Sequence, residues 1–203
     1  MSSTPVGANS ADSLVPSSRV RIHRDLNVVR RSAPYEQEPG YYEPGGLWLY
    51  GNVRLLHGDL KHIPACFGAP VHRPADLDQI ERAAEEIVLA SKILVCGVHN
   101  QTCQRAAIVP LRWGSPRILV FSGGFRYHLG PDLTREPFLS ATLWREQFDA
   151  RTDLVISRRA PDKLPTYAHH NPTVDRLIHL LAKGQWIGLN SPRDSLTPFV
   201  STG

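Results

Sequence analysis

Short apolar segments alternate with amphipathic segments along most of the chain, and no other feature constrains the fold as strongly. Strands are predicted where branched and aromatic residues gather in short runs. These runs lie at 47–50, 93–96, 117–122, 153–157 and 186–189, with a weaker candidate at 63–67 that contains Pro64. Apolar residues recur every three or four positions over 76–90, 102–111, 137–148 and 173–183, which predicts helices there. Asp76 is expected to cap the first helix, with Gln79 at the capping-box position.

Strands that alternate with helices form βαβ units, in which the strands are parallel and the crossovers are right-handed. The sequence therefore predicts an α/β fold with an open, doubly wound, mostly parallel sheet of the Rossmann-like kind, in three layers. We expect this domain to span residues 47–190. Residues 191–203 are rich in Ser, Thr and Pro, which is typical of a loose tail.

Residues 1–46 are expected to form a flexible arm that is basic and Pro-rich. Residues 1–18 carry Ser, Pro, Ala and Asn without periodicity, a composition typical of disorder. The arginines of residues 19–31 fit either a short edge strand or a mobile basic arm. Residues 32–46 then form a connector of Pro, Gly, Tyr and Glu, so the folded part is expected to begin near Leu47.

The charge balance permits a polyanionic partner without requiring one. The 203 residues carry a net charge of +4, and nearly all of the basic side chains are arginines. Arginine suits bidentate phosphate contacts, although an excess of arginine also results from a GC-rich genome. No apolar run approaches the roughly 18 residues of a membrane span, and no secretory signal begins the sequence. With three cysteines in no zinc-like spacing, these features predict a cytoplasmic protein without a membrane partner.

Candidate binding residues follow the predicted strands, because ligands of such sheets bind beyond the carboxyl ends of the strands. Glycines at these ends let backbone N–H groups approach a phosphate, although a plain turn also uses glycine. Arginines after the strand at 153–157 and on the helix that follows would add guanidinium contacts to the same anion. The predicted phosphate-binding or nucleic-acid-binding residues are Gly68, Gly97, His99, Asn100, Ser122, Gly123, Gly124, Arg126, Arg158, Arg159 and Arg176.

Nucleotide fingerprints and catalytic constellations are missing from the sequence. Neither GxGxxG nor a P-loop occurs, so a standard dinucleotide or nucleoside triphosphate site is not expected. Cys103 lies near a helix N-terminus, where a thiolate is favoured, but no Cys/His/Asp order supports a nucleophile. The histidines, among them His169, His170 and His179, form no HxxxH pair with a carboxylate partner. We therefore predict no catalytic residue, no metal and no cofactor.

The order of these segments resembles the Rossmann-like domain of the DNA-processing protein A (DprA/Smf) family, in the SLOG superfamily. Residues 47–56, a strand followed by Gly-Asn and two leucines, look like that family's entry segment. Residues 96–99 fall on its Ser-Gly-x-Ala motif, and Ala106 lies in the helix that follows. The strand that ends in Gly123-Gly124 matches the family's strand that ends in a Gly turn.

Other family motifs are altered in this chain. The Gly-Ser-Arg turn reads Gly68-Ala69-Pro70, and the Gly-Ile-Asp motif is replaced by residues 101–103. Arg158 stands where the family has Glu after a strand. Arg176 alone is kept of the two arginines in the family's Arg-Asn-Arg-Ile-Ile segment. The resemblance covers residues 47–190.

The resemblance implies a function in DNA recombination. In the family this domain binds single-stranded DNA, forms dimers and helps to load the RecA recombinase. The resemblance thus predicts a non-catalytic protein that binds single-stranded DNA or nucleotide phosphates at the carboxyl-terminal edge of the sheet, as a homodimer with a recombinase partner. Two alternatives remain open: a SLOG-type sensor of a small nucleotide-derived ligand, and a nucleotide phosphoribohydrolase-like enzyme. The hydrolase signature Pro-Gly-Gly-x-Gly-Thr is missing, which argues against the enzyme.

Overall fold

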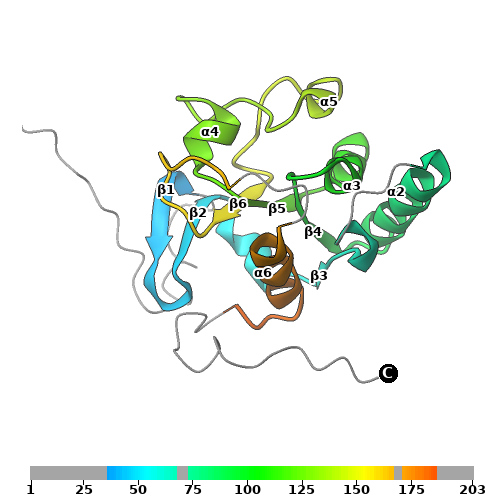
Figure 1. Cartoon of the computed structure of the whole chain (residues 1–203), viewed down its shortest axis with the longest axis horizontal. Coiled ribbons are helices and arrows are strands. Elements are labelled where there is room, and N and C mark those ends of the chain that lie inside the picture. Colours follow the sequence, from blue (N-terminus) through cyan, green and yellow to red (C-terminus); the bar gives the residue numbers. More distant parts are fainter. Residues whose placement is uncertain (1–35, 68–72, 167–170, 187–203) are drawn as a thin grey trace, which may run out of the picture.

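One mixed sheet organises the part of the chain that the computed structural model describes, residues 36–67, 73–166 and 171–186 (Figure 1). Its strands are β1 (Glu36–Tyr42), β2 (Leu47–Gly51), β3 (Leu60–Lys61), β4 (Ile93–Gly97), β5 (Arg117–Phe121) and β6 (Leu154–Ser157). The six strands lie in the order β1-β2-β6-β5-β4-β3. Strands β3, β4, β5 and β6 are parallel to one another. Strand β2 is antiparallel to both of its neighbours, β1 and β6. The predicted α/β fold with a mostly parallel sheet is confirmed.

Helices pack on both faces of this sheet (Figure 1). The α-helices are α2 (Pro74–Leu89), α3 (Gln101–Arg112), α4 (Phe125–Leu129), α5 (Leu139–Thr142) and α6 (Pro172–Ala182), and the 3₁₀ turns are η1 (Glu43–Gly45), η2 (Val53–His57) and η3 (Pro64–Cys66). Successive strand residues point to opposite faces. In β5, Leu119 and Phe121 belong to the core cluster that also holds residues of α2, α3 and α4, whereas Ile118 and Val120 belong to the cluster on the other face, with residues of α6. The parallel strands are therefore buried on both sides, which explains their continuous apolar runs.

Helix starts differ from the prediction where proline competes with a capping residue. Helix α2 begins at Pro74, with Arg73 at the N-cap and without a side-chain cap, so Asp76 lies in the first turn and pairs with Arg73 instead. Proline favours the first helical position because its missing N–H is not needed there. Helix α3 has Asn100 at its N-cap, and the amide side chain accepts a hydrogen bond from the N–H of Cys103.

Two predicted elements were wrong. The segment 63–67 holds the turn η3 rather than a strand, because Pro64 cannot donate to a ladder, and the short strand β3 lies just before it. The long helix predicted over 137–148 reduces to α5, and the chain instead forms α4 directly after Gly124. Within 137–148, Leu139 and Leu143 are strongly exposed, so the apolar periodicity there does not mark a buried face.

The sheet begins before Leu47, inside the segment predicted to be part of the arm. Strand β1 pairs with β2, and its last residue, Tyr42, packs its ring 5.2 Å from that of Trp186. Burial of Tyr42 against the second core explains why this part is ordered. The remainder of the arm at 1–35, the predicted strand after Trp186 and the tail at 191–203 lie outside the described residues. No described helix is long and apolar enough to cross a membrane.

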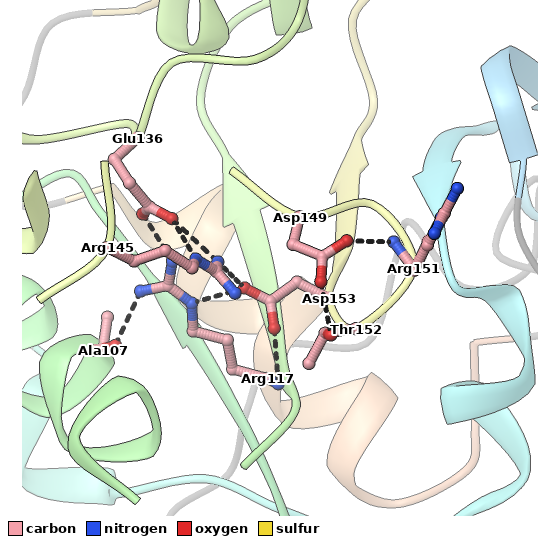
Figure 2. A network of polar contacts seen from close by, with 8 residues as sticks. All are labelled: Ala107, Arg117, Glu136, Arg145, Asp149, Arg151, Thr152 and Asp153. Carbon is pink, nitrogen blue, oxygen red and sulfur yellow. Dashed lines mark hydrogen bonds and ion pairs between the residues drawn. The ribbon is translucent and has the colours of Figure 1, made fainter. Parts of the chain in front are cut away.

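A buried ion network lies at the start of β5 (Figure 2). The Arg117 guanidinium is wholly buried; its Nε lies 2.9 Å from Asp153 Oδ2 and its Nη2 lies 2.5 Å from Glu136 Oε2. Its Nη1 donates to the carbonyl of Ala107 in α3 at 2.8 Å. Arg145 contacts both carboxylates from the solvent side, so two cations face two anions. The network links β5, α3, the 134–150 segment and Asp153, the residue just before β6, at the end of the sheet opposite to the predicted site.

Candidate functional site

A pocket of about 180 Å³ lies at the carboxyl ends of β5 and β6. Its floor includes the last residue of β5, Phe121, and its walls come from the segments after β5 and β6 and from the first turn of α6. The lining residues are Phe121, Ser122, Arg158, Arg159, Thr166, Asn171, Thr173, Val174 and Leu177. The structure therefore brings Ser122, Arg158 and Arg159 together, at the edge where the sequence places an anion site.

The arginines give this pocket an excess of positive charge. Desolvation lowers the pKa of the Arg158 guanidinium below its ordinary value, and the nearby charge of Arg176 lowers it further. Arg158 forms no ion pair with a carboxylate among the described residues. The Arg159 side chain donates from Nη1 to the carbonyl of Leu164 at 3.3 Å. The backbone N–H of Arg159 donates to Ser157 Oγ at 3.0 Å. Two like charges that disfavour each other would be stabilised by a bound anion.

The start of α6 adds partial positive charge to the same pocket. Asn171 is the N-cap and its side chain accepts a hydrogen bond from the N–H of Val174, while Pro172 occupies the first helical position. Asn171 and Thr173 line the pocket. A helix N-terminus attracts anions because its first N–H groups lack partners within the helix. Sequence reasoning did not select Asn171 and Thr173, although the Asn-Pro-Thr order is a recognisable helix start.

Gly123 and Gly124 contact the chain itself rather than open space. The segment 158–166, which follows β6, packs on them: the N–H of Gly124 donates to the carbonyl of Lys163 at 2.7 Å. A Cβ added to Gly124 would lie 2.2 Å from the Pro161 oxygen, and one added to Gly123 would lie 2.7 Å from the Pro165 Cα. The expected close approach to the glycines is therefore made by backbone of the 158–166 loop, so the Gly124 amide is not available to a phosphate.

Gly97, His99 and Asn100 lie at the end of β4, and none of them lines the pocket. Asn100 is buried, and its amide accepts from Thr102 Oγ1 at 2.7 Å while it caps α3. His99 Nε2 lies 3.3 Å from Asp175 Oδ1 in α6. Burial acts to lower the pKa of His99, but the hydrogen bond to Asp175 and the negative charges nearby outweigh it and raise that pKa. These three residues shape the protein interior next to the pocket.

The remaining candidates lie at the rim or outside the described residues. Arg126 Nε is 3.4 Å from Asp162 Oδ1, in an exposed pair between α4 and the 158–166 loop. Gly68 lies outside the described residues, as do His169 and His170. Within the part of the chain that the structure describes, no group of three His, Cys, Asp or Glu side chains could hold a metal ion.

His128, next to Phe121, is expected to make the free energy of unfolding depend on pH. Its ring packs 4.4 Å from that of Phe121, and burial, with the charge of Arg135, lowers the pKa of His128 to about 4. Because an unfolded histidine titrates near 6.5, the neutral ring stabilises the fold above pH 6.5, and this stability is lost as the pH falls toward 4. Between pH 7 and pH 5 His128 is expected to account for a loss of about 2 kcal/mol.

Urea unfolding of the wild-type chain and of His128→Phe at both pH values measures this contribution. Phenylalanine keeps the packing on Phe121 and removes the titration, so the variant is expected to lose about 2 kcal/mol less than the wild type between pH 7 and pH 5. An equal loss in both proteins would show that His128 is not responsible.

In comparisons with known proteins, no protein-family model, no curated protein and no solved structure matches the chain.

Proposed function

We propose that this chain is a non-catalytic, DprA-like protein with an open, doubly wound, Rossmann-like domain, and that it binds single-stranded DNA through backbone phosphates. The pocket at the ends of β5 and β6 is the proposed contact for one phosphate. The observation that carries the proposal is the meeting of Arg158 and Arg159 with the N-terminus of α6 in that pocket. Guanidinium groups and helix N–H groups are the donors that phosphates prefer.

The size of the pocket favours a strand over a small nucleotide. Pockets that enclose a complete small ligand measure roughly 300–1,000 Å³. The volume here is about 180 Å³, which suits a phosphate group with the rest of the ligand outside. A polymer supplies further phosphates to other basic residues along the surface, so its affinity does not depend on one enclosed group.

Fluorescence anisotropy with a labelled oligo-dT strand tests the proposal. The affinity should fall linearly with the salt concentration on logarithmic axes, because each phosphate contact releases counterions. Arg158→Glu is expected to weaken binding about tenfold or more and to reduce the salt slope by about one or two. The effect should be similar for strands of different sequence, since a phosphate contact carries no base information.

Arg54→Glu is the matched control. It changes the net charge by the same amount as Arg158→Glu. Arg54 lies in η2, just after the end of β2, and that end pairs with Leu154, the first residue of β6. Arg54 is therefore at the opposite end of the strands from the pocket. The control should bind nearly as the wild type does. Equal weakening of binding by both variants would show that the effect of Arg158→Glu comes from the change in net charge and not from a contact in the pocket. If the wild-type chain instead gains thermal stability with a mononucleotide or ADP-ribose and binds no strand at low salt, the proposal is wrong and the small-ligand sensor replaces it.

A further inference from the structure

Two of the three cysteines lie side by side where η3 meets the start of α3. Cys103 Sγ lies 3.7 Å from the carbonyl oxygen of Cys66, and Cys66 Sγ lies 3.8 Å from the carbonyl oxygen of Thr102. Each sulfur thus rests on the backbone of the other cysteine's segment, and both cysteines are free and buried.

The surroundings of Cys103 favour its thiolate. Cys103 is the third residue of α3, and its N–H is capped by Asn100. The hydrogen bond from Cys66 lowers the pKa of the Cys103 thiol. Burial and the negative charge of Asp175 oppose this effect, whereas the positive charge of His99 and a hydrogen bond with the Gly97 backbone support it. His99 is in turn paired with Asp175. His99 and Cys103 are four residues apart, and α6 brings the distant Asp175 against His99.

The other two cysteines differ from Cys103 in this respect. The interaction with Cys103 and burial both raise the pKa of Cys66, and burial raises the pKa of Cys96. Cys96 and Cys103 are almost equally inaccessible, with 3% and 0% of their surface exposed. A difference in reactivity between them would therefore reflect their charged surroundings rather than their exposure.

We propose that Cys66 and Cys103 are a redox-active pair that a peroxide converts to a reversible disulfide. The Cys103 thiolate attacks hydrogen peroxide: an S–O bond forms, the O–O bond breaks, and hydroxide takes up a proton and leaves as water. The Cys66 sulfur then attacks the sulfenic acid of Cys103. An S–S bond forms, the S–O bond breaks, and the Cys66 proton leaves with hydroxide as a second water. Two thiols are oxidised and one peroxide is reduced to two waters.

The proposal is independent of DNA binding. It concerns the core between η3 and α3, and neither cysteine lines the pocket. Small oxidants reach buried thiols through local openings of the native state, so the reaction is expected to be slow but selective.

Mass spectrometry of the full chain tests the linkage. The protein is treated with hydrogen peroxide and then alkylated in denaturant. The expected product is an intramolecular Cys66–Cys103 disulfide that a dithiol reductant reverses, with Cys96 alkylated. Trypsin leaves Cys96 and Cys103 on one peptide, residues 93–105, so fragment ions between Gly97 and Thr102 assign the linked cysteine.

Two single variants and one control variant test the roles. In Cys66→Ser, dimedone should trap a sulfenic acid on Cys103, and in Cys103→Ser neither remaining cysteine should be trapped. Cys96→Ser should form the disulfide as the wild type does. In the untreated wild type, iodoacetamide should alkylate Cys103 about tenfold faster than Cys96.

Three outcomes would overturn the proposal. In the first, the disulfide involves Cys96; in the second, disulfides form only between chains. In the third, all three cysteines of the native chain stay reduced under conditions that oxidise the denatured chain. Trapping on Cys66 rather than on Cys103 would overturn the assigned roles.

Discussion

Arg117→Met is expected to lower the free energy of unfolding by about 3–5 kcal/mol, because it leaves two buried carboxylates without their main cation. Glu136 and Asp153 are wholly buried, and Arg145 alone would face both of them (Figure 2). Methionine fills much of the space of the arginine stem, so lost packing is a minor part of the effect. Urea unfolding followed by circular dichroism measures the change.

Arg105→Met is the matched control for this prediction. Arg105 pairs with Glu81 on the outer surface of α2 and α3, where its side chain is 40% exposed, and such pairs contribute about 0–1 kcal/mol. A further variant separates charge from packing: adding Glu136→Gln and Asp153→Asn to Arg117→Met should recover part of the lost stability. An Arg117→Met variant as stable as Arg105→Met would show that the network does not stabilise the fold.

The central strands and long helices could be predicted from the sequence because their patterns are local. Strand β5 is a run of branched residues closed by glycines, and α6 has both a proline start and an apolar face, so their bounds follow closely from the residues. Strand β1 could not be predicted in this way. It contains Pro39 and Gly40, and it owes its place to pairing with β2 and to contact between Tyr42 and Trp186, which are distant in sequence.

The candidate site shows the same division. Arg158 and Arg159 could be placed at the carboxyl edge because they directly follow a strand, and parallel strands share that edge. The sequence could not predict what lies against Gly123 and Gly124, because a glycine pair permits close approach by a phosphate and by a protein loop alike. The ion network was also missed, since Arg117, Glu136 and Asp153 come from three separate segments and no spacing links them.

Gly124→Ala is expected to destabilise the fold by about 3–4 kcal/mol and to weaken the proposed binding of single-stranded DNA. The backbone of Gly124 has an ordinary φ of −71°, so the cost comes from space alone. The new Cβ would lie 2.2 Å from the carbonyl oxygen of Pro161 and 2.4 Å from that of Ala160, and both are backbone atoms that can move only with the loop. Overpacking costs about 1–3 kcal/mol, and the loss of the Gly124–Lys163 hydrogen bond leaves a buried N–H that costs a further 1–3 kcal/mol or so.

The new methyl group would push the 158–166 loop away from residue 124, and this displacement would move Arg158 and Arg159, which belong to that loop and line the pocket. Oligo-dT anisotropy under conditions where the variant is still folded should therefore show weaker binding. Gly184→Ala is the control: a Cβ there meets nothing within 4 Å, and only its φ of +67° costs about 1–2 kcal/mol. Equal destabilisation by both variants would mean that the 158–166 loop yields easily to the new methyl group. Unchanged oligo-dT binding by a destabilised Gly124→Ala would show that the 158–166 loop does not make the proposed phosphate contact.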